Sequence, residues 1–149
     1  MHIHSPSVVI RDTGTAKGRG AFATRAHRAG ETVEVCPVIL FTGTFGSVPL
    51  EVRRILFNWG VLAGTSSSHC LALGYGSMYN HDNPANMRYE ADVGAHGLRF
   101  VAVRDIGEGE ELTVNYNAVG GGHESQADTW FTTQGVLPVL PSGRPANDD

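Results

Sequence analysis

Short apolar segments alternate with turn-forming residues along most of the chain. Runs that are rich in β-branched residues and flanked by turn signals are typical of strands. We expect strands over seven ranges: Val8–Arg11, Ala21–Thr24, Thr32–Leu40, His69–Leu73, Asn86–Glu90, Leu98–Arg104 and Glu111–Tyr116. The 19 glycines cluster between such segments, which indicates tight connections between short strands.

One stretch, residues 48–62, has a helical pattern instead. Pro49 suits a first helical position, and Gly60 is expected to end the helix. Four apolar residues can share one broad side of it: Leu50, Ile55, Leu56 and Trp59. Because strands and helices do not alternate, the pattern predicts a mostly β domain with one short inserted helix. It argues against a doubly wound nucleotide-binding fold.

Length and composition narrow the class of protein. A chain of 149 residues with 41% hydrophobic and 17% charged residues is typical of one globular domain. We expect this domain to span residues 1–137 and residues 138–149 to form a flexible tail. The sequence shows no apolar run of membrane-spanning length, and its first residues lead us to expect no secretion signal. Cys36 and Cys70 lack metal-ligand spacing, so we expect a reduced cytoplasmic protein without structural zinc.

The charge balance bears on the partner. The net charge is −4, and the basic residues are ten arginines and Lys17. A nucleic-acid-binding protein normally carries a basic stripe, so we expect no direct nucleic-acid binding. Because no apolar run is long enough to span a bilayer, we also expect no membrane partner. A mildly acidic surface favours a basic protein partner, although steering of this size is weak in physiological salt.

Three segments carry candidate chemistry. They are KGRGAFA (Lys17–Ala23), GYGSMYNHDNPAN (Gly74–Asn86) and GEELTVNYN (Gly109–Asn117). The first lacks the third glycine and the following helix of a dinucleotide fingerprint, so that interpretation is rejected. In the second, Asn80-His81 ends an apolar run, which is unusual for a simple turn.

In this order and with these separations, the segments resemble the motifs of SET-domain protein lysine methyltransferases, closest to the short stand-alone members in bacteria and viruses. Gly18-Arg19-Gly20 is similar to the first motif, Asn80-His81 with Asn86 to the second, and Glu111-Leu112…Tyr116 to the third. The resemblance covers about residues 8–116. It implies a β-clip-like SET fold of small sheets with a C-terminal pseudoknot.

The resemblance also implies a site for S-adenosyl-L-methionine, which is converted to S-adenosyl-L-homocysteine. The residues that correspond to its binding positions are Gly18, Arg19, Gly20, Asn80 and His81, with Trp130 as an aromatic lid. Tyr75 and Tyr79 are candidates for the wall of a substrate channel, although core packing is the alternative for both. Tyr116 corresponds to the catalytic tyrosine.

Methyl transfer to an amine requires an uncharged nucleophile. A free lysine has a pKa of about 10.4, so it must lose its proton before it reacts. An apolar channel next to a positive sulfonium disfavours the ammonium form by desolvation and by like charge. No dedicated general base is then needed, and the hydroxyl of Tyr116, by resemblance, orients the amine.

The sequence departs from the family pattern at three positions, of which Asn115 and Ala118 keep alternatives open, whereas Pro84 is interpreted as a local variation of a turn. Asn115 precedes the tyrosine where Asp or Ser is usual, Ala118 replaces a common aromatic, and Pro84 stands one residue early. The alternatives are a non-catalytic SET-like domain that binds cofactor or a basic peptide, and methylation of a group other than protein lysine. The degree of methylation and a homodimer are left open.

The resemblance to short members sets the expected location. A bacterial protein of this type would be cytoplasmic, whereas a viral or effector protein would be nuclear or directed to a host.

Overall fold

A computed structural model describes residues 3–65 and 68–116 of the chain. Its largest element is a five-stranded antiparallel sheet in the order β4-β5-β3-β8-β7. The strand bounds are β3 Thr32–Phe41, β4 Leu56–Phe57, β5 His69–Ala72, β7 Met87–Asp92 and β8 Gly97–Ala102. A register shift between Thr32 and Glu34 interrupts the alternation along β3, and all four residues from Val33 to Cys36 are buried.

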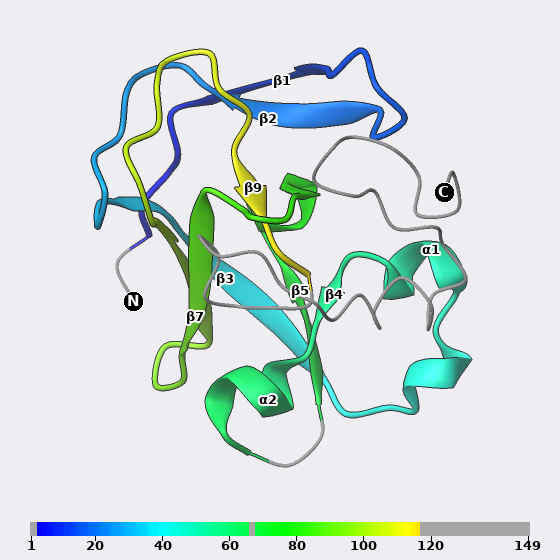
Figure 1. Ribbon diagram of the computed structural model, residues 1–149. Coiled ribbons are helices and arrows are strands. Elements are labelled where there is room, and N and C mark those ends of the chain that lie inside the picture. The colour runs from blue at the N-terminus through cyan, green and yellow to red at the C-terminus, as the bar shows by residue number, and fades with distance from the viewer. Residues whose placement is uncertain (1–2, 66–67, 117–149) are drawn as a thin grey trace.

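Two smaller sheets complete the described β structure. Strands β1 (Val8–Asp12) and β2 (Arg19–Ala23) form an antiparallel pair at one end of the molecule (Figure 1). Strands β6 (Asn80–His81) and β9 (Thr113–Val114) form a short parallel pair. The expected mostly β fold of small sheets is therefore confirmed.

The expected single helix over residues 48–62 is wrong. The structure has a 3-10 turn at Phe45–Ser47, helix α1 at Leu50–Arg53 and helix α2 at Trp59–Ala63. Strand β4 lies between the two helices because Leu56 and Phe57 pair with β5. The Asn58 side chain then accepts a hydrogen bond from the Val61 N–H (3.1 Å) and starts α2 anew.

Gly60 lies inside helix α2 rather than after its end. The helix is closed instead by Gly64, which adopts the left-handed conformation with φ 67°. None of the helices in the described ranges combines the length and apolarity that crossing a bilayer requires.

The core lies between the five-stranded sheet and the segments that cross it. Its largest fully buried side chains include Tyr79, Met87, Leu98, Phe100, Ile106 and Leu112. The rings of Tyr79 and Phe100 pack edge to face with centroids 5.0 Å apart. Cys36 and Cys70 are buried free thiols in the same core.

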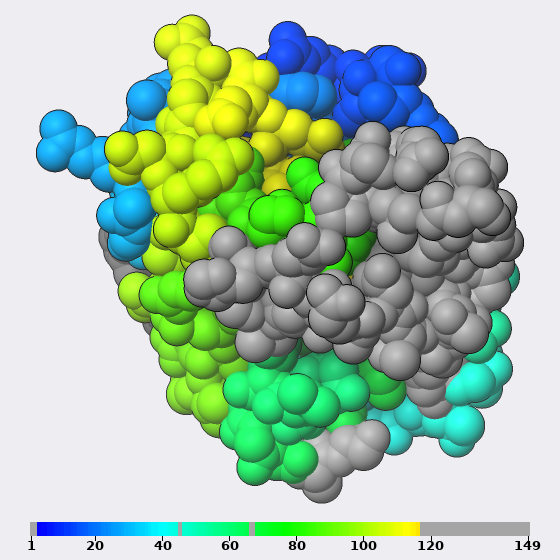
Figure 2. Space-filling view, in the orientation of Figure 1, coloured from blue at the N-terminus to red at the C-terminus, as the bar shows by residue number. Residues whose placement is uncertain are grey.

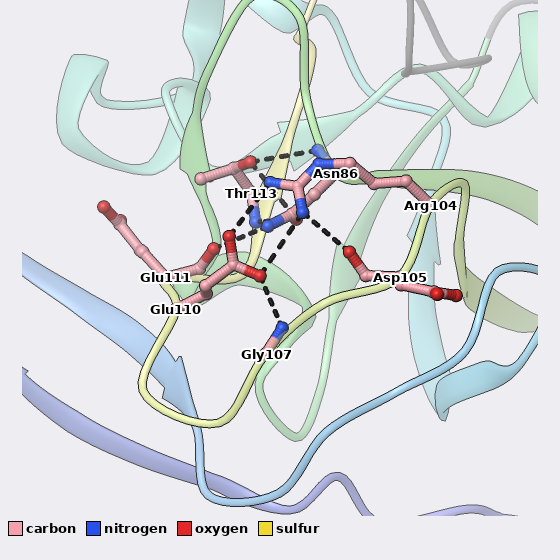
Figure 3. A network of polar contacts seen from close by, with 7 residues as sticks. All are labelled: Asn86, Arg104, Asp105, Gly107, Glu110, Glu111 and Thr113. Atoms are coloured by element: carbon pink, nitrogen blue, oxygen red, sulfur yellow. Dashed lines mark hydrogen bonds and ion pairs between the residues drawn. The ribbon is translucent and has the colours of Figure 1, made fainter.

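Asn86 holds the β9 segment in place (Figure 3). Its buried amide nitrogen donates to the Glu111 carbonyl (2.7 Å), and its amide oxygen accepts from the Thr113 N–H (2.9 Å). The Asn86 N–H in turn donates to the Thr113 hydroxyl (3.2 Å). One side chain thus satisfies main-chain groups that a neighbouring strand would otherwise pair.

A second contact in Figure 3 fixes the turn before β9. The Glu110 carboxylate accepts from the Gly107 N–H (2.5 Å) and pairs with the guanidinium of Arg104 (3.3 Å). The conformation of this turn is therefore fixed by contacts within residues 104–110, before the chain enters the core.

Asn86→Ala should lower the free energy of unfolding by about 2–4 kcal/mol, because it leaves buried main-chain donors and acceptors without partners. Urea denaturation measures the change. Arg88→Ala is the control, since it removes only an exposed ion pair with Glu90 (2.8 Å) and should cost about 0–1 kcal/mol. Equal effects of the two substitutions would contradict the assignment.

His27→Leu should make stability less sensitive to pH. Burial, with Arg25 and His4 nearby, lowers the pKa of His27 below 6.5, whereas Glu31 opposes the shift. Nε2 has no hydrogen-bond partner among the described residues, and Nδ1 lies 3.5 Å from Oε1 of Glu31. The unfolded chain therefore binds this proton more readily, and the free energy of unfolding falls as the pH drops below 6.5 toward the lowered folded-state pKa.

Denaturation between about pH 7.5 and about pH 5.5 measures this slope. Some slope should remain in the variant because burial also lowers the pKa of His69. Glu31 has a pKa lowered to about 2, so its own contribution is lost mainly at more acidic pH. An unchanged slope in His27→Leu would overturn the assignment.

Candidate functional site

Residues 109–116 bring the three candidate segments together. Main-chain hydrogen bonds join Gly109 and Glu110 to Ala23, and Leu112 to Ala21, on strand β2 (2.7–2.8 Å). The chain then enters β9, whose Thr113 and Val114 pair with Asn80 and His81 of β6. Figure 2 shows this yellow segment lying between the blue N-terminal residues and the green middle of the chain.

The two glycines of the first segment serve different local purposes. Gly18 has φ +74°, a conformation that glycine adopts without a steric penalty, and closes the turn through its carbonyl and the Thr13 N–H (2.7 Å). At Gly20 an added Cβ would lie 2.5 Å from the Glu111 carboxylate and 3.0 Å from the Asn80 amide nitrogen. Gly20 therefore makes room for that pair of side chains.

Asn80 is held from two sides. Its amide nitrogen donates to the Arg19 carbonyl (2.8 Å) and to Oε2 of Glu111 (2.8 Å). The Arg19 side chain is exposed, so the contact of this residue with Asn80 is made by the main chain. A negative charge thus lies beside the Asn80 amide, next to the glycine turn.

His81 and Tyr116 are in direct contact. The main-chain N–H of Tyr116 donates to Nδ1 of His81 (3.0 Å), so this ring nitrogen acts as an acceptor. The two rings lie with centroids 5.3 Å apart and a tilt of 56°. Since His81 belongs to β6 and Tyr116 lies two residues after β9, this contact links the two segments just beyond the parallel strand pair.

The hydroxyl of Tyr116 points to the main chain just before Asn80. It donates to the Tyr79 carbonyl at 2.8 Å. Burial, with the nearby Glu111 carboxylate, raises the pKa of Tyr116 to about 12. The phenol is therefore protonated near neutral pH, so it can donate a hydrogen bond but is not a general base.

Tyr79 and Tyr75 lie differently from each other. The Tyr79 side chain is buried, and its hydroxyl donates to Oε1 of Glu34 (2.7 Å); only its carbonyl faces Tyr116. Tyr79 thus packs in the core, which was the alternative to a channel wall. Tyr75 remains exposed, and its main-chain N–H donates to Oε2 of Glu34 (2.9 Å). A channel role for the Tyr75 ring stays a prediction.

The sequence assigned no role at the site to the side chains of two acidic residues. Glu111 belongs to the third motif, where the composition is typical of an exposed turn, yet its carboxylate accepts a hydrogen bond from the Asn80 amide. Glu34 is buried, and the available signal was a single charge inside the apolar run Val33–Leu40. Asn115 is also fully buried, and its carbonyl accepts from the Tyr89 hydroxyl (3.3 Å).

Some predicted positions lie outside the described residues. These are the Trp130 lid, Ala118 and the tail over residues 138–149. Their roles and the expected domain boundary stay predictions.

The chain is similar to known proteins over most of its length. The SET domain family model matches residues 18–117. A curated relative from Schizosaccharomyces pombe, "Histone-lysine N-methyltransferase, H3 lysine-37 specific", is 32% identical over 147 residues, which is 99% of this chain and 91% of the relative. A second, "Histone-lysine N-methyltransferase SET9" from Phaeosphaeria nodorum, is 39% identical over 67 residues, or 45% of this chain and 10% of the relative.

A solved structure supports the fold independently. A chain of Polycomb Repressive Complex 2 from Chaetomium thermophilum superposes with a TM-score of 0.61 at 23% identity. The match covers 78% of this chain and 16% of that one. The expected SET fold is therefore confirmed.

The expectation of a bacterial, cytoplasmic protein is wrong. Both curated relatives described above are fungal histone-lysine methyltransferases, and nothing in the comparisons supports a bacterial cytoplasmic location.

The family match covers the segment in which Gly20, Asn80 and Tyr116 converge, and the relative from S. pombe extends the similarity to nearly the whole chain. The chain belongs to the SET-domain family of protein-lysine methyltransferases.

Proposed function

We propose that this enzyme transfers methyl groups from S-adenosylmethionine to lysine side chains of a basic protein of the histone type. The observation that carries the proposal is the hydrogen bond from the Tyr116 hydroxyl to the Tyr79 carbonyl, directly before Asn80. This bond places a phenol at the meeting point of the three motif segments.

The residues around Asn80 fit a positively charged cofactor. The Glu111 carboxylate and the Arg19 carbonyl supply negative charge and an acceptor next to the Asn80 amide. When bound, S-adenosylmethionine supplies a methyl group on a positively charged sulfur. Gly18, Arg19, Gly20, Asn80 and His81 are proposed to hold it, with the Glu111 carboxylate favouring its positive charge.

Tyr116 is proposed to orient the attacking amine. Because the pKa of its phenol is raised to about 12, the hydroxyl stays protonated while its oxygen can still accept a hydrogen bond from the amine. The Tyr79 carbonyl fixes the direction of that hydroxyl. Correct alignment of two reacting groups can account for about 7–11 kcal/mol of a barrier in favourable cases, so this orientation matters more than proton transfer.

The proposed substrate is basic. The relative from S. pombe is named for a lysine of histone H3, and it matches nearly the full length of this chain. The net charge of −4 on this chain is compatible with a lysine-rich partner.

The rival is a domain that binds cofactor or a basic peptide without catalysis. Asn115 was one reason to consider it, because relatives commonly carry Asp or Ser there. In this chain the Asn115 side chain is fully buried, and Tyr116 remains in contact with both His81 and Tyr79. This arrangement favours the enzyme.

Tyr116→Phe should lower the rate of methyl transfer to histones by about 100-fold or more, because it removes the orienting hydroxyl. Transfer from labelled S-adenosylmethionine to purified histones measures the rate, and mass spectrometry identifies the lysine. Binding of S-adenosylmethionine, measured by calorimetry, should persist in the variant and report that it is folded.

Tyr89→Phe is the matched control. It also removes a buried tyrosine hydroxyl that donates to a main-chain carbonyl, that of Asn115. It should retain most of the transfer activity. Cofactor binding without any transfer by the wild-type protein to histones or other lysine-rich proteins would support the non-catalytic rival.

Glu111→Gln should weaken binding of S-adenosylmethionine by about 5–10-fold, since it removes the negative charge beside Asn80. Binding of S-adenosylhomocysteine, which lacks the sulfonium charge, should weaken less. Calorimetry with both compounds measures the ratio. The neighbouring Glu110→Gln is the control, because Glu110 binds Arg104 and Gly107 instead. An equal loss for both compounds would show that the charge of Glu111 is not what discriminates them.

A further inference from the structure

Glu34 is a buried acidic residue that has no ionic partner within residues 3–65 and 68–116. Its exposure is 2%, and no cationic side chain among the described residues forms an ion pair with it. Burial raises its pKa, although hydrogen bonds from Tyr75 and Tyr79 oppose the shift. Burying a carboxyl group is costly unless its hydrogen bonds are satisfied. Such a residue in the middle of an apolar strand therefore suggests a specific task.

Both oxygens of Glu34 bind the segment that leads to Asn80. Oε2 accepts from the Tyr75 N–H (2.9 Å), and Oε1 accepts from the Tyr79 hydroxyl (2.7 Å). The chain between these two contacts is the 3-10 turn Gly76–Met78. Glu34 therefore clamps this turn at both of its ends.

The glycine before the turn fits the same arrangement. Gly74 has φ +66°, and an added Cβ there would lie 2.6 Å from Oε2 of Glu34. The chain therefore passes the carboxylate too closely for a side chain at this position. This contact accounts for a glycine in the second segment that the proposed cofactor site does not involve.

Tyr79 connects this clamp to the proposed catalytic tyrosine. Its hydroxyl is fixed by Glu34, its ring packs on Phe100, and its carbonyl receives the Tyr116 hydroxyl (2.8 Å). Tyr79 therefore contacts Glu34 through its side chain and Tyr116 through its main chain. One residue thus links the Tyr116 hydroxyl to a carboxylate that does not touch it.

We propose that Glu34 is a positioning residue for methyl transfer, which acts through Tyr79 on the hydroxyl of Tyr116. This inference rests on the proposed role of Tyr116. Glu34 is expected to affect the alignment of the amine and not the binding of cofactor or protein substrate.

Glu34→Gln and Tyr79→Phe test the proposal. The two contacts use different oxygens of Glu34, and glutamine replaces one of these oxygens with an NH₂ donor, so the two bonds cannot both persist as they are, whereas phenylalanine removes only the bond from the Tyr79 hydroxyl. Each variant should lower kcat by about 10-fold, while KM for a histone substrate and Kd for S-adenosylmethionine change less than about 2-fold. Because Tyr79→Phe keeps the ring, it provides a test even if Glu34→Gln fails to fold.

Coupling between the substitutions separates positioning from general destabilisation. The double variant should lose about as much kcat as either single variant, because both break the same connection. Ser77→Ala is the control: it removes a hydrogen bond to the Ala72 carbonyl (3.0 Å) within the same turn and should leave kcat within about 2-fold of the wild type.

The outcomes distinguish this inference from the proposed function. If Tyr116→Phe loses transfer but Tyr79→Phe and any folded Glu34→Gln retain wild-type kcat, the positioning role is overturned and the function stands. Multiplicative losses in the double variant, or increases in KM and Kd without a fall in kcat, would also overturn it. If Tyr116→Phe retains full activity, the proposed role of the tyrosine itself is wrong.

Discussion

The site depends on one stretch of chain that is hydrogen-bonded on two sides. Residues 109–112 pair with strand β2, and Thr113 and Val114 pair with β6. Asn86 secures the passage between these pairings through buried hydrogen bonds to Glu111 and Thr113. Without this double attachment, the glycine turn before β2 and the Asn80 segment would have no common neighbour. The arrangement of the proposed cofactor-binding groups is therefore a property of the fold and not of any one loop.

The same site is tied to the main sheet by hydrogen bonds that originate in the core. Glu34 lies on the central strand β3, next to a register shift, and reaches the turn before Asn80. Tyr116 is in turn held by Tyr79 and His81. The proposed reaction centre is thus supported by the buried carboxyl group of Glu34 and by the parallel pair of strands β6 and β9. Rigid support of this kind limits the freedom of a reacting group.

Local patterns predicted most strands because alternation and β-branched residues reflect burial on a sheet. They failed over residues 48–62, where pairing of Leu56 and Phe57 with β5 divided the expected helix. They also missed strand β6, since a two-residue parallel pair has no periodic signal. The positions of Asn80 and Tyr116 were suggested by motif resemblance. The contacts of Glu34 and Glu111 required three-dimensional information, because each joins residues at least 31 positions apart.

The missing side chain at Gly20 has a consequence for how such motifs are interpreted. A Gly-x-Gly sequence is commonly taken as a sign that backbone lies against a ligand. In this chain the second glycine is required because an amide and a carboxylate already occupy the adjacent space. A glycine at this position therefore indicates that the side chains of Asn80 and Glu111 pack directly against the main chain of strand β2. A homologue with alanine there would need a shorter or displaced acidic side chain, so these two positions should be compared jointly when sequences are aligned.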